Sequence, residues 1–352
     1  MHSSGPRSTD LERAMTTAEF YLRDPAPRTA WRQAILMGRN SRTYKFALGA
    51  ALLECAAAGR TEVPLAELAE PYAMALASRL RDAPQAPAVG GDDDFLSVAA
   101  REAEQSLAAG RPTERLVDAA RRSMPGMVMD RFHNLTGGSE VRHRFYNETG
   151  KGRNRLVLLT PALRQIAVPE QAAGLRAELA ARWSIVESAF ASGVSRGLLA
   201  DDLDVDVERW LLLDRRRRRP VTGVADALVG FQHGRCLICD EPITPGDKVA
   251  VDHVFPFALM KRFDVVPGGP QPDLDRPWNL APAHEACNGT KSDRMPTPAE
   301  LDRLAGRNEA VMDSPVRLKD SLRASLNHAK LGARPPGNRW PAFLRQVQDH
   351  FS

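Results

Sequence analysis

The 352 residues of the chain are enough to build two or three ordinary domains, each with its own core. Hydrophobic residues make up 43% and charged residues 26%, a balance typical of a folded globular protein rather than a disordered one. No uninterrupted apolar run approaches the ~20 residues that span a bilayer, and the N-terminus has no apolar stretch typical of a secretory signal. We therefore expect a cytoplasmic protein with no membrane partner.

The net charge of +4 is modest, and it is unevenly placed along the chain. Residues 1–206 hold 26 Lys and Arg against 26 Asp and Glu, which leaves 22 basic and 18 acidic residues for residues 207–352. The whole excess therefore belongs to the second part of the chain. A weak basic excess is compatible with a nucleic-acid partner and equally with an ordinary solvated surface.

The first part of the chain predicts mostly helix. Five segments have apolar residues at helical spacing, namely residues 31–37, 44–58, 65–80, 95–109 and 112–124. Between them, the Pro-, Gly- and Asp-rich residues 82–94 predict an exposed loop. We expect residues 1–206 to form a mainly helical region that regulates or targets the protein or drives its oligomerisation.

Two further elements are expected within this region. Residues 141–160 contain strand-like runs on both sides of a Thr-Gly-Lys-Gly turn at residues 149–152, which predicts a hairpin. A long helix should follow Pro169, because apolar residues there recur at steps of three and four. These residues are Leu175, Leu179, Trp183, Val186 and Phe190. Packing into the core is the interpretation that we favour for this stripe.

Five consecutive arginines, residues 215–219, precede the cysteine-rich part of the chain. Such a run is a linker, a solvated helix end or a patch that contacts phosphates, and the sequence leaves these alternatives open. We assign residues 207–233 to a basic linker. Residues 301–352 are expected to form a helical, basic C-terminal extension.

Three of the four cysteines lie close together in the sequence. Cys55 stands alone in a helical stretch and is interpreted as a small buried hydrophobe. Cys236 and Cys239 are separated by two residues, and His284 and Cys287 repeat that spacing. In a chain without an export signal, such a cluster favours metal over a disulfide. Three thiols and one imidazole are an ordinary ligand set for a closed, tetrahedral structural zinc site.

The residues between and after these two half-sites complete an ordered pattern. In chain order it reads CxxC, then DHVFP at residues 252–256, WNL at 278–280 and HEACNGTK at 284–291. This order resembles the HNH endonuclease family, in which a β-hairpin followed by a helix clasps one metal ion. The resemblance covers about 60 residues and implies an HNH nuclease module at residues 234–300. The expected fold is α+β, with a mostly helical N-terminal region and a C-terminal zinc-stapled ββα-metal domain.

Each residue of the pattern has a task that suits its chemistry, and the resemblance implies the same roles. His253 is the expected general base, because an imidazole can take a proton from water near physiological pH. Asp252 and Asn288 offer hard oxygen ligands for a catalytic Mg²⁺ or Mn²⁺. Asn279 is expected to orient the His253 ring by a hydrogen bond.

Two basic residues and two departures from the family pattern complete the description of the module. Lys291 and Arg294 are candidate contacts to substrate phosphates. His284 stands where many relatives have a cysteine, which keeps zinc binding plausible. Residues 266–275 form a Gly- and Pro-rich loop that is longer than a minimal module needs, and it either reaches toward the substrate or extends the surface.

The sequence therefore predicts a metal-dependent endonuclease that acts on DNA, with double-stranded DNA as the expected partner. Residues 43–54 and 181–190 resemble helical modules joined to HNH domains in bacterial host-defence nucleases, which implies a role in anti-phage defence and a homodimer or a regulatory protein partner. Two alternatives stay open. The chain is either a zinc-stabilised nucleic-acid-binding protein without catalysis or a nuclease effector that a partner activates.

Overall fold

The structure is a computed structural model, and it describes most of the chain from residue 20 to residue 314, with parts of the C-terminus. The residues that it describes are 20, 22–38, 42–86, 91–135, 139–191, 203–206, 211–214, 220–221, 224–244, 246–259, 272–314, 322–323, 325–326 and 339–351. The arginine run at 215–219 lies outside the described residues, as does most of the loop at 266–275.

The chain forms two compact units. One consists of Asp24–Gly230, and the other combines Met1–Arg23 with Phe231–Ser352. Within the second unit, the ring of Phe20 stacks on that of His233 with the ring centroids 4.0 Å apart. The roles that the sequence suggested for residues 1–206, for the linker at 207–233 and for the C-terminal extension stay predictions.

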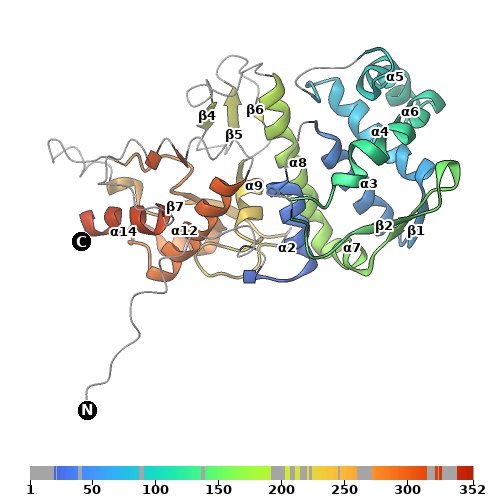
Figure 1. Ribbon diagram of the computed structural model, residues 1–352. Helices are drawn as coiled ribbons and strands as arrows, with labels where there is room; N and C mark the ends of the chain where they lie inside the picture. The colour runs from blue at the N-terminus through green and yellow to red at the C-terminus, as the bar shows by residue number, and fades with distance from the viewer. Residues whose placement is uncertain are drawn as a thin grey trace. The chain divides into compact units, whose positions relative to one another are not determined.

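The Asp24–Gly230 unit is mostly helical, as expected (Figure 1). Its helices are α2 (Pro27–Arg32), η1 (Gln33–Met37), α3 (Tyr44–Ala57), α4 (Leu65–Leu80), α5 (Phe95–Ala109), α6 (Glu114–Met127), η2 (Met129–Arg131), η3 (Gly152–Asn154), α7 (Pro161–Ile166) and α8 (Pro169–Ala191). Helix α9 (Val224–Phe231) ends at the boundary between the units. Asp94 and Thr113 cap α5 and α6, since each side chain accepts a hydrogen bond from a backbone N–H of the first turn.

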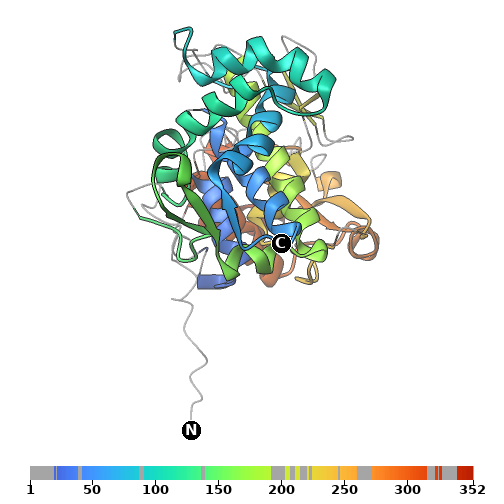
Figure 2. The same cartoon turned by 90° about the vertical axis from the view of Figure 1, so that its right-hand side faces the viewer.

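Helix α3 lies at the centre of this unit, packed against both α4 and α8. In Figure 2 the blue α3 and the yellow-green α8 run side by side. The predicted apolar stripe of α8 is core, because Leu175, Leu179, Trp183 and Val186 are all buried. The side chain of Phe190 lies outside the described residues.

Two small antiparallel sheets accompany the helices. In the first, β3 (Leu156–Leu159) lies between β1 (Glu62–Pro64) and β2 (Tyr146–Thr149), which confirms the hairpin predicted from the turn at residues 149–152. Gly150 has a φ of 72°, and a Cβ there would collide with the carbonyl of Asn154, so this turn requires glycine.

The second sheet was not expected from the sequence. It joins β4 (Leu203–Asp206), β5 (Leu211–Asp214) and β6 (Pro220–Val221), where we predicted the end of a helical region and a linker. Only the LLLD run of β5 carries a continuous apolar signal for a strand, and four residues are too few to separate strand from helix by periodicity.

Within the described residues, the Phe231–Ser352 part contains the smaller sheet and helices α11, α12 and α14. Strands β7 (Val249–His253) and β8 (Leu280–His284) pair antiparallel, and α11 (Glu285–Lys291) follows β8 directly. After it come α12 (Pro298–Asp313) and α14 (Arg339–Phe351), while the 3₁₀ turn η4 (Phe257–Leu259) lies just beyond β7. The predicted α+β class, with a helical N-terminal region and a C-terminal two-strand sheet and helix, is confirmed. No described helix has the length and apolar character needed to cross a membrane.

Helix α12 supports this small sheet through two arginines that are one turn apart. Arg303 donates hydrogen bonds to the carbonyls of Leu237 and Ile238 at 2.6 and 2.7 Å. Arg307 is 2% exposed and donates to the carbonyls of Trp278 and Leu280, among others. Burial lowers the pKa of Arg307 to about 9. These bonds give donors to carbonyls of the CxxC loop, of the segment before β8 and of the first residue of β8.

Replacing Arg307 should therefore destabilise the C-terminal unit. In the variant Arg307→Met, several buried carbonyls lose their donor, each at a cost of ~1–3 kcal/mol, so we expect the free energy of unfolding to fall by ~2–4 kcal/mol. Denaturant melts followed by tryptophan fluorescence measure this change, and Arg345→Met, at a half-exposed position of α14, is the control. Equal stability of Arg307→Met and the wild type would contradict the supporting role of α12.

Candidate metal centre and hydrolytic site

The first half of the metal centre is a tight loop between α9 and β7. The backbone N–H of Cys236 donates to Glu241 O at 2.9 Å, and the N–H of Asp240 donates back to Cys236 O at 3.0 Å. Asp240 completes the turn with a φ of 62°. This reversal of the backbone brings the Cys236 and Cys239 thiols to the same side of the loop, as the CxxC spacing predicted.

The second half lies where β8 ends and α11 begins. His284 is the last residue of β8 and the N-cap of α11, and Cys287 lies in the first turn of that helix. The Nδ1 atom of His284 lies 3.4 Å from Cys239 Sγ and 3.8 Å from Cys287 Sγ. Its other ring nitrogen, Nε2, contacts Pro242 O at 3.3 Å, which holds the ring with Nδ1 toward the sulfurs.

The four predicted ligands meet in one cluster. The ligand atoms of Cys236, Cys239, His284 and Cys287 all lie within 4.8 Å of one another. Cys236 is buried, Cys239 is exposed and the other two are half-buried. Three soft sulfurs and one imidazole nitrogen at these separations suit tetrahedral Zn²⁺. The cluster is therefore a candidate zinc site beside the β7–β8 sheet and α11.

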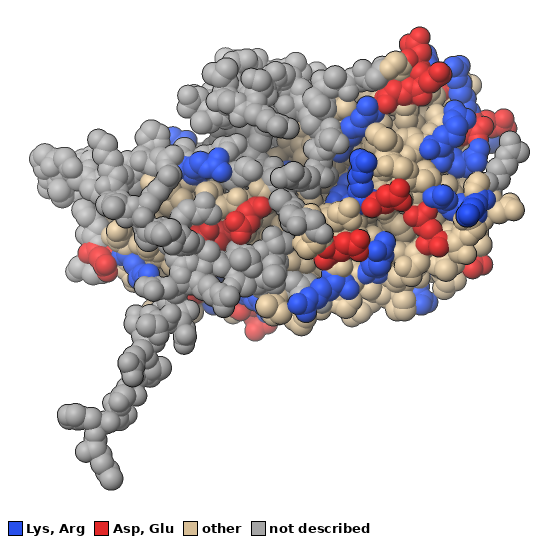
Figure 3. Space-filling model, viewed as in Figure 1, with Lys and Arg blue, Asp and Glu red and all other residues tan. Residues whose placement is uncertain are grey.

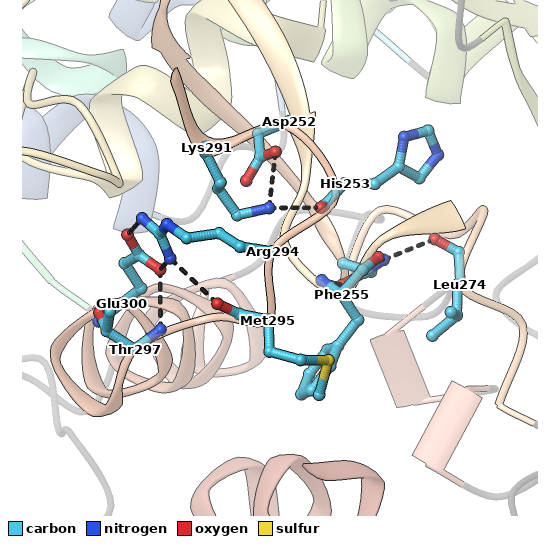
Figure 4. A network of polar contacts seen from close by, with 10 residues as sticks. Asp252, His253, Phe255, Leu274, Lys291, Arg294, Met295, Thr297 and Glu300 are labelled. Carbon is cyan, nitrogen blue, oxygen red and sulfur yellow. Dashed lines mark hydrogen bonds and ion pairs between the residues drawn. The ribbon is translucent and has the colours of Figure 1, made fainter. Parts of the chain in front are cut away.

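Strand β7 carries the predicted Asp-His pair on opposite faces. Neighbouring residues of a strand alternate in direction, and in Figure 4 the Asp252 carboxylate points toward Lys291 while the His253 ring points away from it. Asp252 is 3% exposed, and His253 is half-buried. The two side chains are therefore not in one hydrogen-bonded pair, and each has its own partner.

Helix α11 places the other motif residues on one stripe. Cys287, Asn288 and Lys291 follow His284 at spacings of three, four and seven residues, which put them on the same face of a helix. That face is turned toward the zinc cluster and β7, because Cys287 contacts the cluster and Lys291 reaches Asp252. Asn288 lies between Cys287 and Lys291 along the helix, on the same stripe.

A buried ion pair joins α11 to β7. Lys291 Nζ lies 3.0 Å from Asp252 Oδ1 and 3.1 Å from His253 O, and the side chains of the pair are 0% and 4% exposed. Burial raises the pKa of Asp252, although Lys291 opposes this effect. The second carboxylate oxygen, Oδ2, is buried and has no hydrogen-bond partner among the described residues. Lys291, predicted to contact phosphate, thus lies inside the unit with a carboxylate and a carbonyl as its partners.

The His253 ring has a partner that the sequence did not suggest. Its Nε2 lies 3.0 Å from Asp275 Oδ1, and the two side chains are 24% and 40% exposed. Asp275 closes the Gly- and Pro-rich segment and has no fixed spacing from the motif that marked it as a candidate. The ring of His253 also contacts the exposed ring of Phe257, and the two ring centroids are 5.3 Å apart.

Asn279, predicted to orient the His253 ring, instead binds backbone. Its side-chain oxygen accepts a hydrogen bond from Phe255 N at 2.8 Å, and its amide donates to Phe255 O and Leu274 O, both at 2.9 Å. Asn279 is fully buried. It thus fixes the backbone that follows His253 to the backbone that precedes Asp275, which positions both residues of the His253–Asp275 contact.

Arg294, the second predicted phosphate contact, is bound within the chain. Its Nη1 donates to Glu300 Oε2 at 2.8 Å and to Met295 O at 3.0 Å. Figure 4 shows this fork beside the N-terminus of α12, where Glu300 also accepts from Thr297 N and closes a capping box. Glu300 is 2% exposed, whereas the side chain of Arg294 is 41% exposed. These contacts give Arg294 a structural task at the start of α12.

Comparisons with protein-family models, with curated proteins and with solved structures found no match. The HNH resemblance therefore depends on the motif residues and on the geometry described above.

The zinc site makes a direct prediction. Replacing Cys239 by serine removes one of four ligands, so the variant Cys239→Ser should lose its stoichiometric zinc and melt at a lower temperature, because binding energy in such sites is folding energy. Elemental analysis and thermal melts measure both effects. Cys55→Ser, remote from the cluster in sequence, should keep zinc and melt like the wild type. Purified wild-type protein without zinc, together with an unchanged melt of Cys239→Ser, would contradict the assignment.

Proposed function

We propose that the chain is a metal-dependent HNH-type endonuclease that hydrolyses phosphodiester bonds of DNA. The observation that carries this proposal is the arrangement around β7 and α11. An orphaned carboxylate oxygen of Asp252, an imidazole at His253 and an amide at Asn288 lie on a two-strand sheet and helix next to a Cys₃His cluster. This is the residue set, in the order and on the elements, that the HNH motif predicts.

The zinc site has a structural role in this proposal. All four positions of a tetrahedral ion are filled by protein ligands, so no position is open for water or substrate. The ion would join the Cys236–Cys239 loop to α11, two segments that belong to different parts of the unit. Zinc therefore fixes α11 against the sheet and does not take part in hydrolysis.

Asp252 and Asn288 are the proposed ligands of a catalytic Mg²⁺ or Mn²⁺. The buried Oδ2 of Asp252 has no donor among the described residues, and an acceptor without a donor suits a hard cation. Asn288 lies on the face of α11 that looks toward β7, within the same stripe as Lys291. When bound, the ion would act as a Lewis acid on the scissile phosphate.

His253 is the proposed general base, with Asp275 as its positioning residue. If Nε2 carries the proton that it shares with Asp275 Oδ1, Nδ1 is left as the acceptor. Nδ1 takes a proton from water, the water oxygen forms a bond to phosphorus, and the bond from phosphorus to the leaving 3′-oxygen breaks. The Asp275 carboxylate holds the ring in place through its contact with Nε2.

Lys291 is assigned to the Asp252 carboxylate rather than to the substrate. A substrate phosphate could recruit its ammonium group only by breaking a buried ion pair, and such breaks are costly. We propose that Lys291 holds Asp252 in place and limits its negative charge. The helical Asp24–Gly230 unit is proposed to target or regulate the nuclease, as a homodimer or with a protein partner, in defence against phage.

The same ion pair favours one second candidate. Since Lys291 already neutralises Asp252, the chain could bind nucleic acid through its zinc-stabilised unit without cleaving it. Incubation with plasmid, single-stranded DNA and RNA, with and without Mg²⁺ or Mn²⁺, separates the two functions. Cleavage that depends on the divalent ion supports the nuclease, and retention of intact nucleic acid under all conditions supports the binding protein.

The variant His253→Ala tests the mechanism. It removes the proposed base and none of the four zinc ligands, so cleavage should fall at least ~10²-fold while zinc content, melting temperature and DNA binding stay at wild-type values. Asn288→Ala should also lose activity, through weaker binding of the divalent ion, whereas Asp252→Ala should lose both activity and stability, because it leaves Lys291 buried without its carboxylate. High Mn²⁺ should therefore restore part of the activity of Asn288→Ala and none of that of His253→Ala. A folded His253→Ala protein that cleaves at the wild-type rate would overturn the mechanism.

Asp275 has its own test. The variant Asp275→Asn keeps the size of the side chain and removes its charge, so we expect kcat to fall ~10-fold or more, with KM and zinc content unchanged. Asp275→Glu should recover part of kcat, because the carboxylate is restored. Asp293→Asn, at an exposed position of the same unit, is the matched control. A wild-type kcat in Asp275→Asn would show that the contact with His253 has no part in catalysis.

A further inference from the structure

Helices α3 and α8 of the Asp24–Gly230 unit pack against each other, and two cations lie at one end of this interface, which we call the α3–α8 seam. A Cβ at Gly49 would stand 2.8 Å from Leu179 Cδ1, so the backbones of the two helices approach closely at this point. One turn further along, the rings of Phe46 and Trp183 stack with centroids 6.0 Å apart. Lys45 and Arg182 are the sequence neighbours of these two rings. The helices therefore bring Lys45 of α3 and Arg182 of α8 to the same end of the seam.

Lys45 is buried with few partners. It is 5% exposed, and its Nζ makes one long hydrogen bond, 3.4 Å to the carbonyl of Asn134. It also lies 5.9 Å from the centroid of the Phe132 ring. A Cβ at Gly38 would stand 2.5 Å from both Nζ and the carbonyl oxygen of Ala34, so the ammonium group lies close against the backbone at Gly38. Burial first, and then the positive charge of Arg182, lower the pKa of Lys45 to about 8.

The positive charge of Arg182 has fewer partners than that of Lys45. It is 2% exposed, its Nε has no hydrogen-bond partner, and no acidic residue pairs with it among the described residues. Burial lowers its pKa to about 9. A guanidinium that is both buried and unpaired is rare, because the loss of hydration is normally offset by a carboxylate.

The acids next to Arg182 on α8 are already bound. Glu178, one turn before it, pairs with Arg32 at 2.8 Å, and Glu187, further on, pairs with Arg79 at 2.9 Å. His133, the other titratable group close to Lys45, has its pKa lowered to about 3, first by burial and then by the charges of Arg144 and Lys45. The end of the seam thus holds two positive charges and a neutral imidazole, with no negative charge to balance them in the described chain.

We infer that Lys45 and Arg182 form a binding site for a small phosphate-bearing anion inside the helical unit. The site is separate from the proposed nuclease centre and does not depend on that function. Two cations match the charge of a phosphate monoester, which is about −1.5 to −2 at pH 7. The planar guanidinium can bind two phosphate oxygens at once, and the ammonium group supplies a further donor.

The burial of the two cations decides the size of the ligand. A nucleic-acid duplex presents its phosphates on a wide, rigid surface and cannot reach groups that are 2% and 5% exposed. The ligand that we infer is therefore a single phosphate group on a small molecule. On the face of this unit in Figure 3, basic and acidic side chains are interspersed, so the two buried cations are not part of a broad basic surface.

Thermal melting of the full chain tests the site with inorganic phosphate and AMP as probes. Protein dialysed into a chloride buffer should melt at a higher temperature when either probe is added at matched ionic strength, since a ligand that binds only the folded state stabilises it. Small molecules released on heat denaturation are identified by mass spectrometry, so that an anion carried through purification is also detected.

Two variants make the test specific. Arg182→Met and Lys45→Met remove one buried charge each and keep an unbranched side chain, so both should fold and melt without ligand at or above the wild-type temperature. Each should bind phosphate and AMP at least ~10-fold more weakly, as expected when one of two charged contacts to the anion is lost. Arg176→Met, at an exposed position of the same helix, should bind both probes like the wild type.

The outcomes separate cleanly. A phosphate or AMP shift that is lost in Arg182→Met, or a stoichiometric anion released from the wild type and not from Arg182→Met, supports the site. An equal shift in both proteins, or no shift together with no released anion, overturns it. His253→Ala should keep the full response, so failure of the nuclease mechanism leaves this test unaffected.

Discussion

A buried ion pair between Asp252 and Lys291 joins strand β7 of the two-stranded sheet to α11, the helix that follows β8. Its geometry determines where the rest of the candidate site lies. Because Lys291 reaches back to β7, the face of α11 that carries Cys287 and Asn288 is turned toward the sheet and the zinc cluster. The pair also uses only one of the two Asp252 oxygens and leaves Oδ2 as a buried acceptor.

A buried pair of this kind adds little net stability over apolar packing, but breaking it by removing one partner is costly. Its contribution is therefore the fixed register of α11 on β7, which a sheet of two strands could not define by itself.

The motif alone does not form a stable module, because most of its backbone is irregular. The CxxC loop and the segment before β8 contain carbonyls that no helix or sheet ladder satisfies, and α12 supplies their donors through Arg303 and Arg307. Helix α14 also packs on the segment before β8. The ring centroids of Trp340 and Phe343 lie 6.0 and 5.0 Å from that of Trp278. The extension after residue 300, expected as a basic flank, is thus part of the core in its described helices. The buried Arg307 and the half-buried Arg303 both bind the backbone of this unit.

The sequence predicted the residues whose positions follow from short spacings. The CxxC and HxxC pairs form the candidate zinc cluster, and the stripe of α11 follows from steps of three and four residues. The contacts of Asp275, Arg303 and Arg307 could not be predicted in this way, since each reaches a partner more than 20 residues away and no repeat or motif relates the two.

The hydrogen-bond partners of Asn279 could not be predicted either. Its position in the motif was evident, but the choice between a ring nitrogen and backbone groups as its partner depends on how residues 254 and 274 approach it. The β4–β6 sheet was missed because its strands have four residues or fewer, which is too short for the alternation of Leu203–Asp206 in β4 to identify a strand.

The two units place buried cations in opposite situations. In the C-terminal unit, Lys291 has a carboxylate at 3.0 Å, and Arg307 is surrounded by carbonyl groups, so each charge is satisfied by the chain itself. In the helical unit, Arg32 and Arg79 are paired with acids of α8, whereas Arg182, on the same helix between those acids, has none among the described residues. Burial imposes a similar desolvation cost on all of them. Among the described residues, the fold thus supplies acidic partners for the neighbouring arginines and none for Arg182 and Lys45. The anion proposed above would supply the negative charge that these two cations lack in the described part of the chain.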